Sequence, residues 1–277
     1  MKILATAGPG EVRAMAWSGR PIDAAIWRPG SPDGVGDLYR GRIGKVVPAM
    51  AGAFVVLGEQ DGFLPDSAGA RGLSEGASVA VRVVRAAQGG KGPRLAAVQA
   101  DIGIGHPGLI ARGPDAVSRL AAQYPDAPVI VDDLAFLADL RPTLAERVTF
   151  GPAFTDDVAS AFAALLAPTA DLQGGARLHV HITPALTALD IDLGTSTAER
   201  RDKAASQSAA NRGLIPAIAA QIRLRNLSGA ILLDFGGMSV KQRAGLGPAL
   251  TSALATDPLQ PRFLGFSGLG LAEILRP

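Results

Sequence analysis

The sequence predicts a mixed fold that combines an all-β barrel with an α/β layer. Between Asp37 and Ala97, short apolar runs alternate with Gly, Pro and Asp, a pattern typical of a small barrel of about 60 residues. Over about the last hundred residues, strand-like and helix-like patterns alternate, as they do in an α/β layer. The chain has 277 residues, of which 48% are hydrophobic and 19% charged, so it can bury a substantial core.

The first part of the chain predicts short strands and then the barrel. Residues 2–30 indicate two strands separated by a turn at Gly8–Gly10, and the turn-rich stretch 29–36 marks a boundary. The barrel strands are expected in the segments LYRGRIGKVVP, GAFVVLG, DGFLP, SVAVRVVRA and PRLAAV.

The remainder of the chain predicts alternating helices and strands. The apolar run ILLDF is continuous rather than alternating, which indicates a strand buried on both faces. The longest expected helix contains Gly213 and Pro216, and we expect it to break there. In order, the expected elements are a helix at 115–123, a strand at 128–133, a helix at 156–166, two strands within 176–192, a helix over 197–225, a strand at 230–235, a helix at 241–256 and a strand at 261–266.

The composition excludes several kinds of site. The chain has no cysteine, which excludes disulfides, thiolate zinc sites, iron–sulfur clusters and cysteine nucleophiles. Its longest apolar stretch, residues 46–57, contains Pro48 and Gly52 and is too short to span a bilayer. The N-terminus lacks the apolar segment of a signal peptide, so we expect a cytoplasmic protein without a membrane span. The net charge is only +2, although residues 36–99 and 181–243 are locally basic.

Three aspartates follow strand patterns in the last third of the chain. Asp190 and Asp192 are two residues apart, so on a strand they face the same side. Asp234 ends a buried strand, and if the two strands are neighbours the three carboxylates meet at one edge of a sheet. Such a cluster can hold Mg²⁺, which activates water and offsets charge at a phosphodiester. The alternative is that these acids meet water or cap the next helix.

The predicted barrel carries aromatic side chains among cations. Such a surface suits stacking on unpaired bases and contact with phosphates. The alternative is that the phenylalanines fill the barrel. The loop 89–94 groups backbone amides with two cations, but no Ser or Thr follows Lys91 as a Walker motif requires. The residues concerned are Tyr39, Phe54 and Phe63, interleaved with Arg40, Arg42, Lys45, Lys91 and Arg94.

Other motifs give little support to further chemistry. Residues 103–108 fit the pattern G-x-G-x-x-G, but Pro107 stands within it and no acid-tipped strand follows at the required distance. There is no G-x-S-x-G motif, so a serine hydrolase is not supported. We interpret His179 and His181, which share a strand face without other imidazole partners, as structural residues.

Several segments together resemble the ribonuclease E/G family. DLYRGRIGKVVPAMAGAFVVLG, DGFLP and GGKGPRL follow one another as in that family's RNA-binding OB-fold insert. GGARLHVHITPALTALDIDLG is similar to the family's catalytic strand pair, and the stretch from Asn211 to Met238 is similar to its second catalytic segment. The resemblance implies an RNase H-like region formed by residues 1–35 and 100–175, which includes a contracted sensor region, an OB-fold barrel at 36–99 and a DNase I-like catalytic domain at 176–277.

The resemblance also assigns roles to individual residues. Asp190 and Asp234 match the two catalytic aspartates that bind Mg²⁺, and Asp192 takes the place of a catalytic asparagine. Phe54, Phe63 and Lys91 match RNA-contacting positions of the insert. The further RNA-binding residues that we expect are Tyr39, Arg40, Arg94, Arg112, Arg223 and Arg225, of which Arg223 or Arg225 would balance charge at the phosphorus.

The activity implied is that of a Mg²⁺-dependent endoribonuclease. Members of the family hydrolyse single-stranded, AU-rich RNA to 5′-phosphate and 3′-hydroxyl products during RNA processing or decay. The alternative is a catalytically inactive RNA-binding protein of the same ancestry.

The chain departs from the family pattern at several places. Segment 109–113 keeps Arg112 but lacks the threonine of the family's 5′-end sensor, Gly237 replaces an acid, and Pro216 interrupts the register of the helix. The chain has no cysteine, so the cysteines of the family's zinc link are absent from it, and we expect it to lack the small domain that follows them in the family. We therefore expect no zinc. The expected partners are single-stranded RNA and, as one option for assembly, a second copy in a homodimer.

Overall fold

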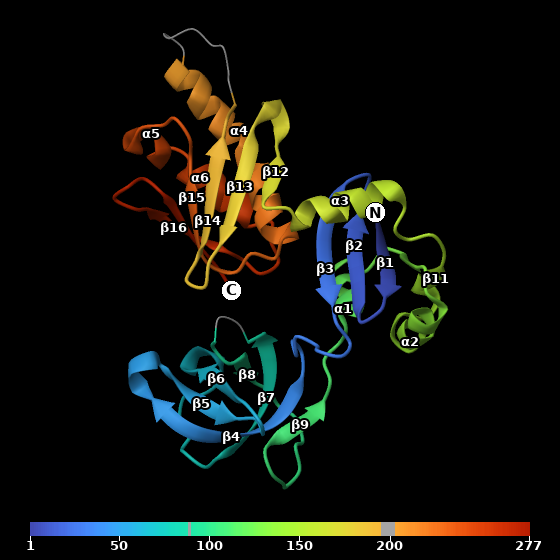
Figure 1. The fold of residues 1–277 in the computed structure, drawn as a ribbon. Helices are drawn as coiled ribbons and strands as arrows, with labels where there is room; N and C mark the ends of the chain where they lie inside the picture. Colours follow the sequence, from blue (N-terminus) through green and yellow to red (C-terminus); the bar gives the residue numbers. More distant parts are fainter. Residues whose placement is uncertain (88–89, 195–202) are drawn as a thin grey trace. The chain divides into compact units, whose positions relative to one another are not determined.

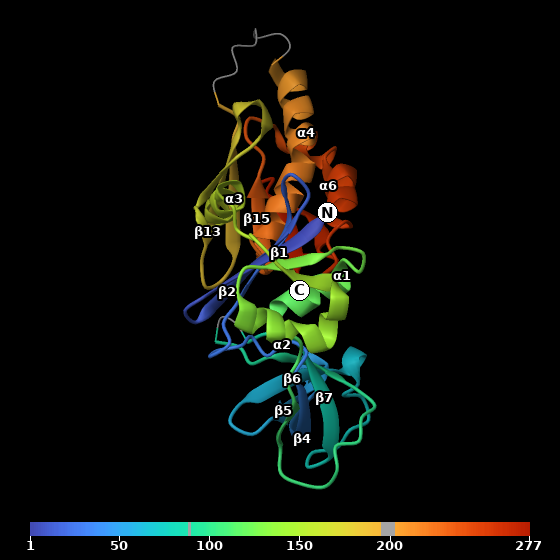
Figure 2. The same cartoon turned by 90° about the vertical axis from the view of Figure 1, so that its right-hand side faces the viewer.

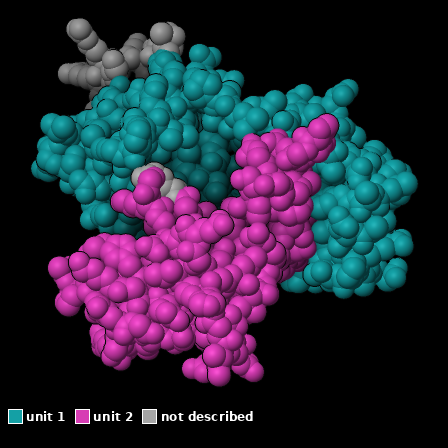
Figure 3. Space-filling view, turned by 60° about the horizontal axis from the view of Figure 1, so that its bottom comes forward, with its two compact units in different colours: residues 1–7, 13–25, 124–277 teal, residues 8–12, 26–123 magenta. Residues whose placement is uncertain are grey.

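The computed structural model describes residues 1–87, 90–194 and 203–277. The chain forms two compact units, one of residues 1–7, 13–25 and 124–277 and the other of residues 8–12 and 26–123 (Figure 3). Each unit has its own cluster of buried hydrophobic side chains. Within the described ranges, no helix is long and apolar enough to cross a bilayer.

A five-stranded sheet is formed by the N-terminal strands and two later ones. Its order is β11-β10-β1-β2-β3, with β1 (Lys2–Gly8), β2 (Glu11–Trp17), β3 (Pro21–Trp27), β10 (Val129–Val131) and β11 (Val148–Phe150). β1, β10 and β11 run parallel. Parallel neighbours need a crossover, and α2 (Leu134–Leu144) supplies it between β10 and β11.

Two features of this region differ from the prediction. The N-terminal stretch contains three strands rather than two. The sequence pattern also did not predict α2, because Pro142 near its end weakens the helical signal. The helix begins nonetheless where the Asp133 side chain accepts a hydrogen bond from the Phe136 backbone N–H at 2.7 Å. The two helices that the pattern did predict are present as α1 (Ala116–Gln123) and α3 (Asp156–Leu166).

The predicted barrel is confirmed as a closed five-stranded sheet (Figure 1). Strands pair in the order β5-β6-β8-β7-β4, and the pairing of β4 with β5 closes the ring, while β9 adds to β4. A short turn joins β5 to β6. One side of each strand faces the same small core, which is lined by Ile43, Val55, Leu64, Val81 and Leu95. The strands are β4 (Leu38–Val47), β5 (Gly52–Val56), β6 (Asp61–Pro65), β7 (Ser78–Arg85), β8 (Arg94–Ala97) and β9 (Gly108–Ala111).

A six-stranded sheet occupies the C-terminal part of the chain, in the order β12-β13-β14-β15-β17-β16. Only β14 and β15 are parallel, and α4 (Lys203–Leu224) lies between them in the chain. Helices α4 and α6 (Gly247–Leu254) lie along one face (Figures 1 and 2), where they share a core with the sheet. The strands are β12 (Thr169–Asp171), β13 (Arg177–Ile182), β14 (Thr187–Asp192), β15 (Gly229–Asp234), β16 (Arg262–Phe266) and β17 (Ala272–Arg276).

The predicted break in α4 is wrong, since the helix continues through Gly213 and Pro216. An interior proline costs a helix about 3 kcal/mol. Burial of each large aliphatic side chain contributes about 1.5–3 kcal/mol, so a packed face outweighs that cost. The buried residues of this face are Leu214, Ile215, Ile218 and Ile222. The beginning of the helix predicted at 197–202 lies outside the described residues.

The end of the chain also differs from the prediction. The single helix expected at 241–256 is two helices, α5 (Val240–Ala244) and α6, with Gly245 and Leu246 between them. Strand β17 was not predicted, and it pairs between β15 and β16.

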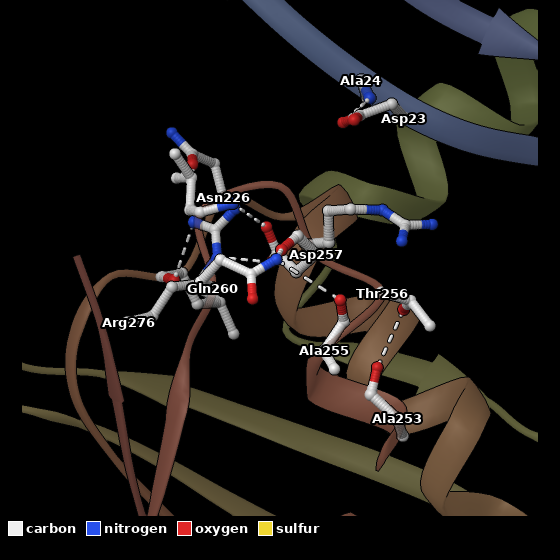
Figure 4. A network of polar contacts seen from close by, with 12 residues as sticks. Asp23, Ala24, Asn226, Ala253, Ala255, Thr256, Asp257, Gln260 and Arg276 are labelled. Atoms are coloured by element: carbon white, nitrogen blue, oxygen red, sulfur yellow. Dashed lines mark hydrogen bonds and ion pairs between the residues drawn. The ribbon is translucent and has the colours of Figure 1, made fainter. Parts of the chain in front are cut away.

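A buried ion pair ties β17 into this sheet. Arg276 Nε donates to Asp257 Oδ2 at 2.8 Å, and both side chains are about 5% exposed or less. Arg276 Nη1 also donates to Asn226 Oδ1 at 2.8 Å, close to the end of α4 (Figure 4). A buried charge of this kind is stable only when its partner is present.

Candidate functional site

Asp190 and Asp234 lie side by side on the face of the six-stranded sheet that α4 and α6 do not cover. They are directly opposite each other in the parallel β14–β15 pair, in strands about 4.8 Å apart. Their neighbours along the strands, Leu189, Ile191 and Leu233, point into the core instead. Asp190 is exposed and Asp234 half-buried, so both carboxylates can meet a ligand from solvent. The convergence that the sequence pattern allowed is therefore present for these two residues.

Asp192 lies on the same face, two residues beyond Asp190, but its carboxylate has a local partner. Its Oδ1 accepts a hydrogen bond from the backbone N–H of Gly194 at 2.8 Å. Directly opposite Asp192 on β13 is Arg177, which forms an ion pair with Asp171 at 3.1 Å. Asp192 thus stabilises the turn after β14. Among the described residues, it does not join Asp190 and Asp234 in a group of three carboxylates that could hold a metal ion.

Arg243 contacts Asp234 and was not singled out from the sequence. Its Nη1 donates to Asp234 Oδ1 at 2.7 Å and to the Gly270 carbonyl at 3.0 Å, and its Nε donates to the Met238 carbonyl at 3.0 Å. The Arg243 side chain is 13% exposed and that of Asp234 is 43% exposed. The sequence did offer a signal for this contact, because Arg243 is a basic residue on α5, the helix that follows Asp234 and strand β15. One carboxylate oxygen of Asp234 is therefore already engaged.

The loop after Asp234 is packed so closely that it requires glycine. A Cβ on Gly236 would lie 2.7 Å from the Ile191 carbonyl oxygen. Gly237 has φ +72°, and a Cβ there would lie 2.6 Å from Gln207 Nε2. Glycine at position 237 therefore suits the positive φ of this loop.

Asn211 of α4 is hydrogen-bonded to the same loop. It is fully buried, and its Nδ2 donates to the carbonyls of Gln207 at 3.0 Å and Gly236 at 3.1 Å. Its Oδ1 has no hydrogen-bond partner among the described residues. This side chain therefore fixes the backbone just beyond Asp234.

The two aspartates fit the donor set that Mg²⁺ uses. Mg²⁺ is often held by one or two carboxylates while waters and substrate phosphates complete its shell. Within the described ranges, no group of three or more His, Asp or Glu side chains is placed to hold a metal ion. His179 lies directly opposite Asp190 on β13 and is half-buried, while His181 is exposed. Asp190 and Asp234 would thus be the protein ligands.

On the barrel, Phe54 and Phe63 lie on the outer surface rather than in the core. They are directly opposite each other on β5 and β6, with ring centroids 5.5 Å apart and an interplanar angle of 67°. Phe54 is 38% exposed and Phe63 half-buried. Gly52 makes room for this arrangement, because a Cβ there would lie 2.6 Å from Phe63 Cζ. The alternative in which both rings fill the barrel is wrong.

The other RNA-binding residues predicted on the barrel differ in exposure. Lys91 and Arg94 are exposed. Tyr39 is only 9% exposed and belongs to the barrel core. The Arg40 guanidinium is held by backbone carbonyls, with Nε donating to Ile102 at 2.7 Å. Arg42 and Lys45 are exposed as well, so a polyanion can reach these two cations together with Lys91 and Arg94.

Arg112 is paired with a buried acid of its own unit. Its Nη1 donates to Asp37 Oδ2 at 2.8 Å, while the other oxygen of Asp37 accepts the Gly113 N–H at 2.7 Å. Both residues line a small cavity of about 160 Å³, together with Trp27 and Arg119. Arg119 is likewise paired, with Asp33 at 2.7 Å. The positive charge of this cavity is thus balanced internally.

Arg223 and Arg225, at the end of α4 and just beyond it, bind backbone carbonyls. Arg223 Nη2 donates to the Ile22 carbonyl at 2.8 Å. Arg225 donates to the carbonyls of Ala167 and, at 3.1 Å, Thr169, and burial lowers its pKa. Their proposed role at the phosphorus stays a prediction, since in the structure both guanidiniums serve the fold.

Comparison with known proteins bears on the same part of the chain. The family model described as "Ribonuclease E/G family" matches residues 130–277, more than half of the chain, a segment that contains Asp190, Asp234 and Arg243. Ribonuclease G of Escherichia coli strain K12 is 36% identical over 108 residues, which are 38% of this chain and 22% of that protein. Ribonuclease E of Synechocystis sp. is 32% identical over 112 residues, which are 40% of this chain and 16% of that protein. Ribonuclease G of Haemophilus influenzae is 33% identical over 107 residues, which are 38% of this chain and 22% of that protein.

The aligned segments thus span only 16–22% of each relative's length. On the strength of the family match over residues 130–277, the chain belongs to the ribonuclease E/G family.

Proposed function

We propose that the protein is a Mg²⁺-dependent endoribonuclease that hydrolyses single-stranded RNA in RNA processing or decay. The observation that carries the proposal is the adjacency of Asp190 and Asp234 on an open sheet face, within the segment that matches the family. Two neighbouring carboxylates beside a polyanionic substrate repel it unless a cation lies between them, which favours a metal-dependent enzyme over a simple binding protein.

In this mechanism the side chains hold and orient the reactants. Asp190 and Asp234 would bind Mg²⁺, which supplies an activated water and offsets negative charge at the phosphodiester. Arg243 keeps Asp234 in place through its ion pair. Asp192, two residues from Asp190 on β14, would orient a water with the carboxylate oxygen that does not accept the Gly194 N–H. Attack of a water on phosphorus would break the P–O3′ bond. The phosphate stays on the 5′ end of one fragment, and the 3′ oxygen of the other takes up a proton.

The barrel would bind the RNA strand. Phe54 and Phe63 offer two ring surfaces to unpaired bases, and Lys91 and Arg94 offer charge to phosphates. We also propose that the five-stranded sheet is the family's RNase H-like layer, and that the six-stranded sheet is its DNase I-like layer.

A second candidate is a catalytically inactive RNA-binding protein. The observation that favours it is that two of the three predicted catalytic acids already have partners, Asp234 in Arg243 and Asp192 in Gly194. In such a protein the ion pair would replace the metal as the neutralising partner of Asp234.

An end-labelled, AU-rich single-stranded RNA distinguishes the two candidates. It is incubated with the protein in Mg²⁺, in EDTA, and with Asp190→Asn and Asp234→Asn variants. Asp139→Asn serves as the matched control, because Asp139 is an exposed acid on α2. We expect discrete fragments that need Mg²⁺, disappear in both site variants and persist in the control. Intact RNA that still shifts on a gel would establish the binding protein instead.

A further inference from the structure

Three side chains that carry hydrogen-bond donors lie in line on β13, and we call them the β13 row. The row consists of Arg177, His179 and His181. Leu178 and Val180 alternate with them and are buried in the core that the sheet shares with α4. Successive side chains of a strand point to opposite faces, so the row lies on the uncovered face of the six-stranded sheet. Arg177 and His181 are exposed, and His179 is half-buried.

The β13 row runs directly beside the two aspartates of the proposed metal site. His179 is directly opposite Asp190, which is in turn directly opposite Asp234. Arg177 is directly opposite Asp192. Opposite residues on neighbouring strands point to the same face, and the strands are about 4.8 Å apart. A strand of donors therefore lies next to a strand of acids, with His179 and Asp234 on the two sides of Asp190.

The fold itself does not use the two imidazoles. The sequence pattern predicted His179 and His181 as structural residues, and a structural polar group normally has a hydrogen-bond partner. Among the residues that the structure describes, neither imidazole forms a hydrogen bond or an ion pair, although His179 lies opposite a carboxylate. The ring nitrogens of His179 are not among the buried atoms without a partner, so they reach solvent. Both imidazoles are thus open to a ligand.

Arg177 is engaged through only one of its nitrogens. Its Nε donates to Asp171 Oδ1 at 3.1 Å, in an ion pair whose side chains are 59% and 87% exposed. An ion pair this exposed contributes little to stability. Within the described ranges its two Nη groups, which carry most of the donors of a guanidinium, have no partner. Arg177 can therefore bind a phosphate while it keeps its contact with Asp171.

The opposite side of the metal site has a different character. There β17 presents Glu273 and Leu275 to the same face, since Glu273 is directly opposite Leu232 and Leu275 directly opposite Ala230. Glu273 is half-buried and Leu275 is 37% exposed. An acid and an apolar side chain repel or ignore a phosphate, whereas the β13 row offers it donors. A polyanion that reaches Asp190 and Asp234 is therefore favoured on the β13 side.

We propose that the β13 row binds successive phosphates of the RNA strand, with His179 at the scissile phosphate and Arg177 and His181 at the phosphates that flank it. The proposal rests on the proposed function for its substrate. Side chains two residues apart on a strand are separated by about 6.8 Å, close to the separation of successive phosphates along an extended single strand. Arg177 contributes charge, while each histidine contributes the N–H that an imidazole has in either protonation state. The row thereby positions the phosphodiester against Asp190 and Asp234.

The first test measures a phosphate contact of Arg177. A fluorescein-labelled, AU-rich single-stranded RNA is titrated with the full chain in Mg²⁺ at several salt concentrations. Anisotropy gives the affinity if the RNA stays intact, and the half-saturating protein concentration in single-turnover cleavage gives it otherwise. Each phosphate contact to a single strand contributes about 0.7 to the slope of log K against log salt. We expect Arg177→Ala to lower the slope by about that amount, and Arg177→Lys, which retains the charge, to keep it.

The second test measures the donor of His179. His179→Leu should lower the maximal single-turnover rate by about tenfold to a hundredfold, as expected for the loss of a hydrogen bond to a charged group. His179→Gln, which retains an N–H donor, should recover part of that rate. His181→Ala should instead raise the half-saturating concentration and leave the maximal rate nearly unchanged. This division between rate and affinity would not follow from a loss of stability, and thermal melts establish that each variant is folded.

The matched control is Arg262→Ala, because Arg262 is an exposed arginine on β16, the edge strand of the same sheet. It should leave slope and rate unchanged. A slope for Arg177→Ala equal to that of the parent or of the control would overturn the proposal, as would a His179→Leu variant with the parent's rate. If the parent binds RNA but never cleaves it, the proposed enzyme is wrong, and the slope for Arg177→Ala alone decides whether the β13 row binds phosphate.

Discussion

The guanidinium of Arg243 forms an ion pair with Asp234 at 2.7 Å, at the end of the strand that carries the second predicted catalytic aspartate. The same guanidinium bonds to the carbonyls of Met238 and Gly270. The loop after β15 and the turn before β17 are therefore joined to one carboxylate. The orientation of Asp234 depends on a residue that the strand motif does not contain.

Arg243→Ala should lower the free energy of unfolding by about 1–3 kcal/mol, since it removes a charged hydrogen bond and leaves two carbonyls without a donor. A double-mutant cycle with Asp234→Ala, measured by urea unfolding, isolates the pair. Because Asp234 is 43% exposed, we expect a coupling of about 0.5–1.5 kcal/mol. Additive effects of the two substitutions would mean that the ion pair contributes nothing to stability.

Arg276→Ala should be among the most destabilising single substitutions in the six-stranded sheet. It leaves the carboxylate of Asp257 buried without its partner, a change that typically costs about 3–5 kcal/mol. Chemical unfolding of the variant measures this loss of stability. Replacing both residues, as Arg276→Met with Asp257→Leu, should recover much of the loss. If the single variant is as stable as the parent, water reaches the pair and the site is not buried.

Gly237→Asp, which restores the acid typical of the family, should destabilise the protein by about 1–3 kcal/mol because φ at this position is +72°. The added Cβ would also meet Gln207. Combining the change with Gln207→Ala should recover the part of the lost stability that is caused by the contact with Gln207. Thermal melting of the single and double variants separates this part from the cost of the positive φ. A Gly237→Asp variant with unchanged stability would contradict the account of this loop.

Phe63→Ala and Lys91→Ala should weaken RNA binding in different ways. Loss of the ring removes stacking, which contributes about 1–3 kcal/mol per base and depends little on salt. Loss of the lysine removes a phosphate contact and should lower the salt slope by about 0.7. Affinities at several salt concentrations separate the two effects. Equal slopes for the two variants would count against the barrel as the RNA-binding part.

Arg112 should give little discrimination between RNAs that begin with a 5′-monophosphate and a 5′-hydroxyl, because its charge is already balanced by Asp37. Cleavage rates on the two RNAs measure this. Asp37→Asn retains an oxygen for the Gly113 N–H but removes the competing charge. That variant should acquire a preference for the monophosphate. A strong preference in the parent protein would mean that the ion pair opens for the substrate.

Local patterns predicted the elements that have a clear periodicity or clear turn boundaries along the chain. The helical periodicity of residues 156–166 predicted α3 with the bounds that it has. Short apolar runs between turn residues predicted the barrel. By contrast, α4 continues through Pro216 because four aliphatic side chains of the helix are buried against the sheet. That contribution comes from packing and cannot be obtained from a helical window alone.

The sequence by itself determined which residue types are available for chemistry. It contains no cysteine, and it carries three aspartates in strand patterns and two phenylalanines in a barrel pattern. Only the tertiary structure decided which of them meet. Asp190 is opposite Asp234 because β14 and β15 pair in that register, and Lys45 and Arg85 face outward because each follows a bulge. Register and bulges depend on the partner strand, whereas alternation depends only on neighbours along the chain.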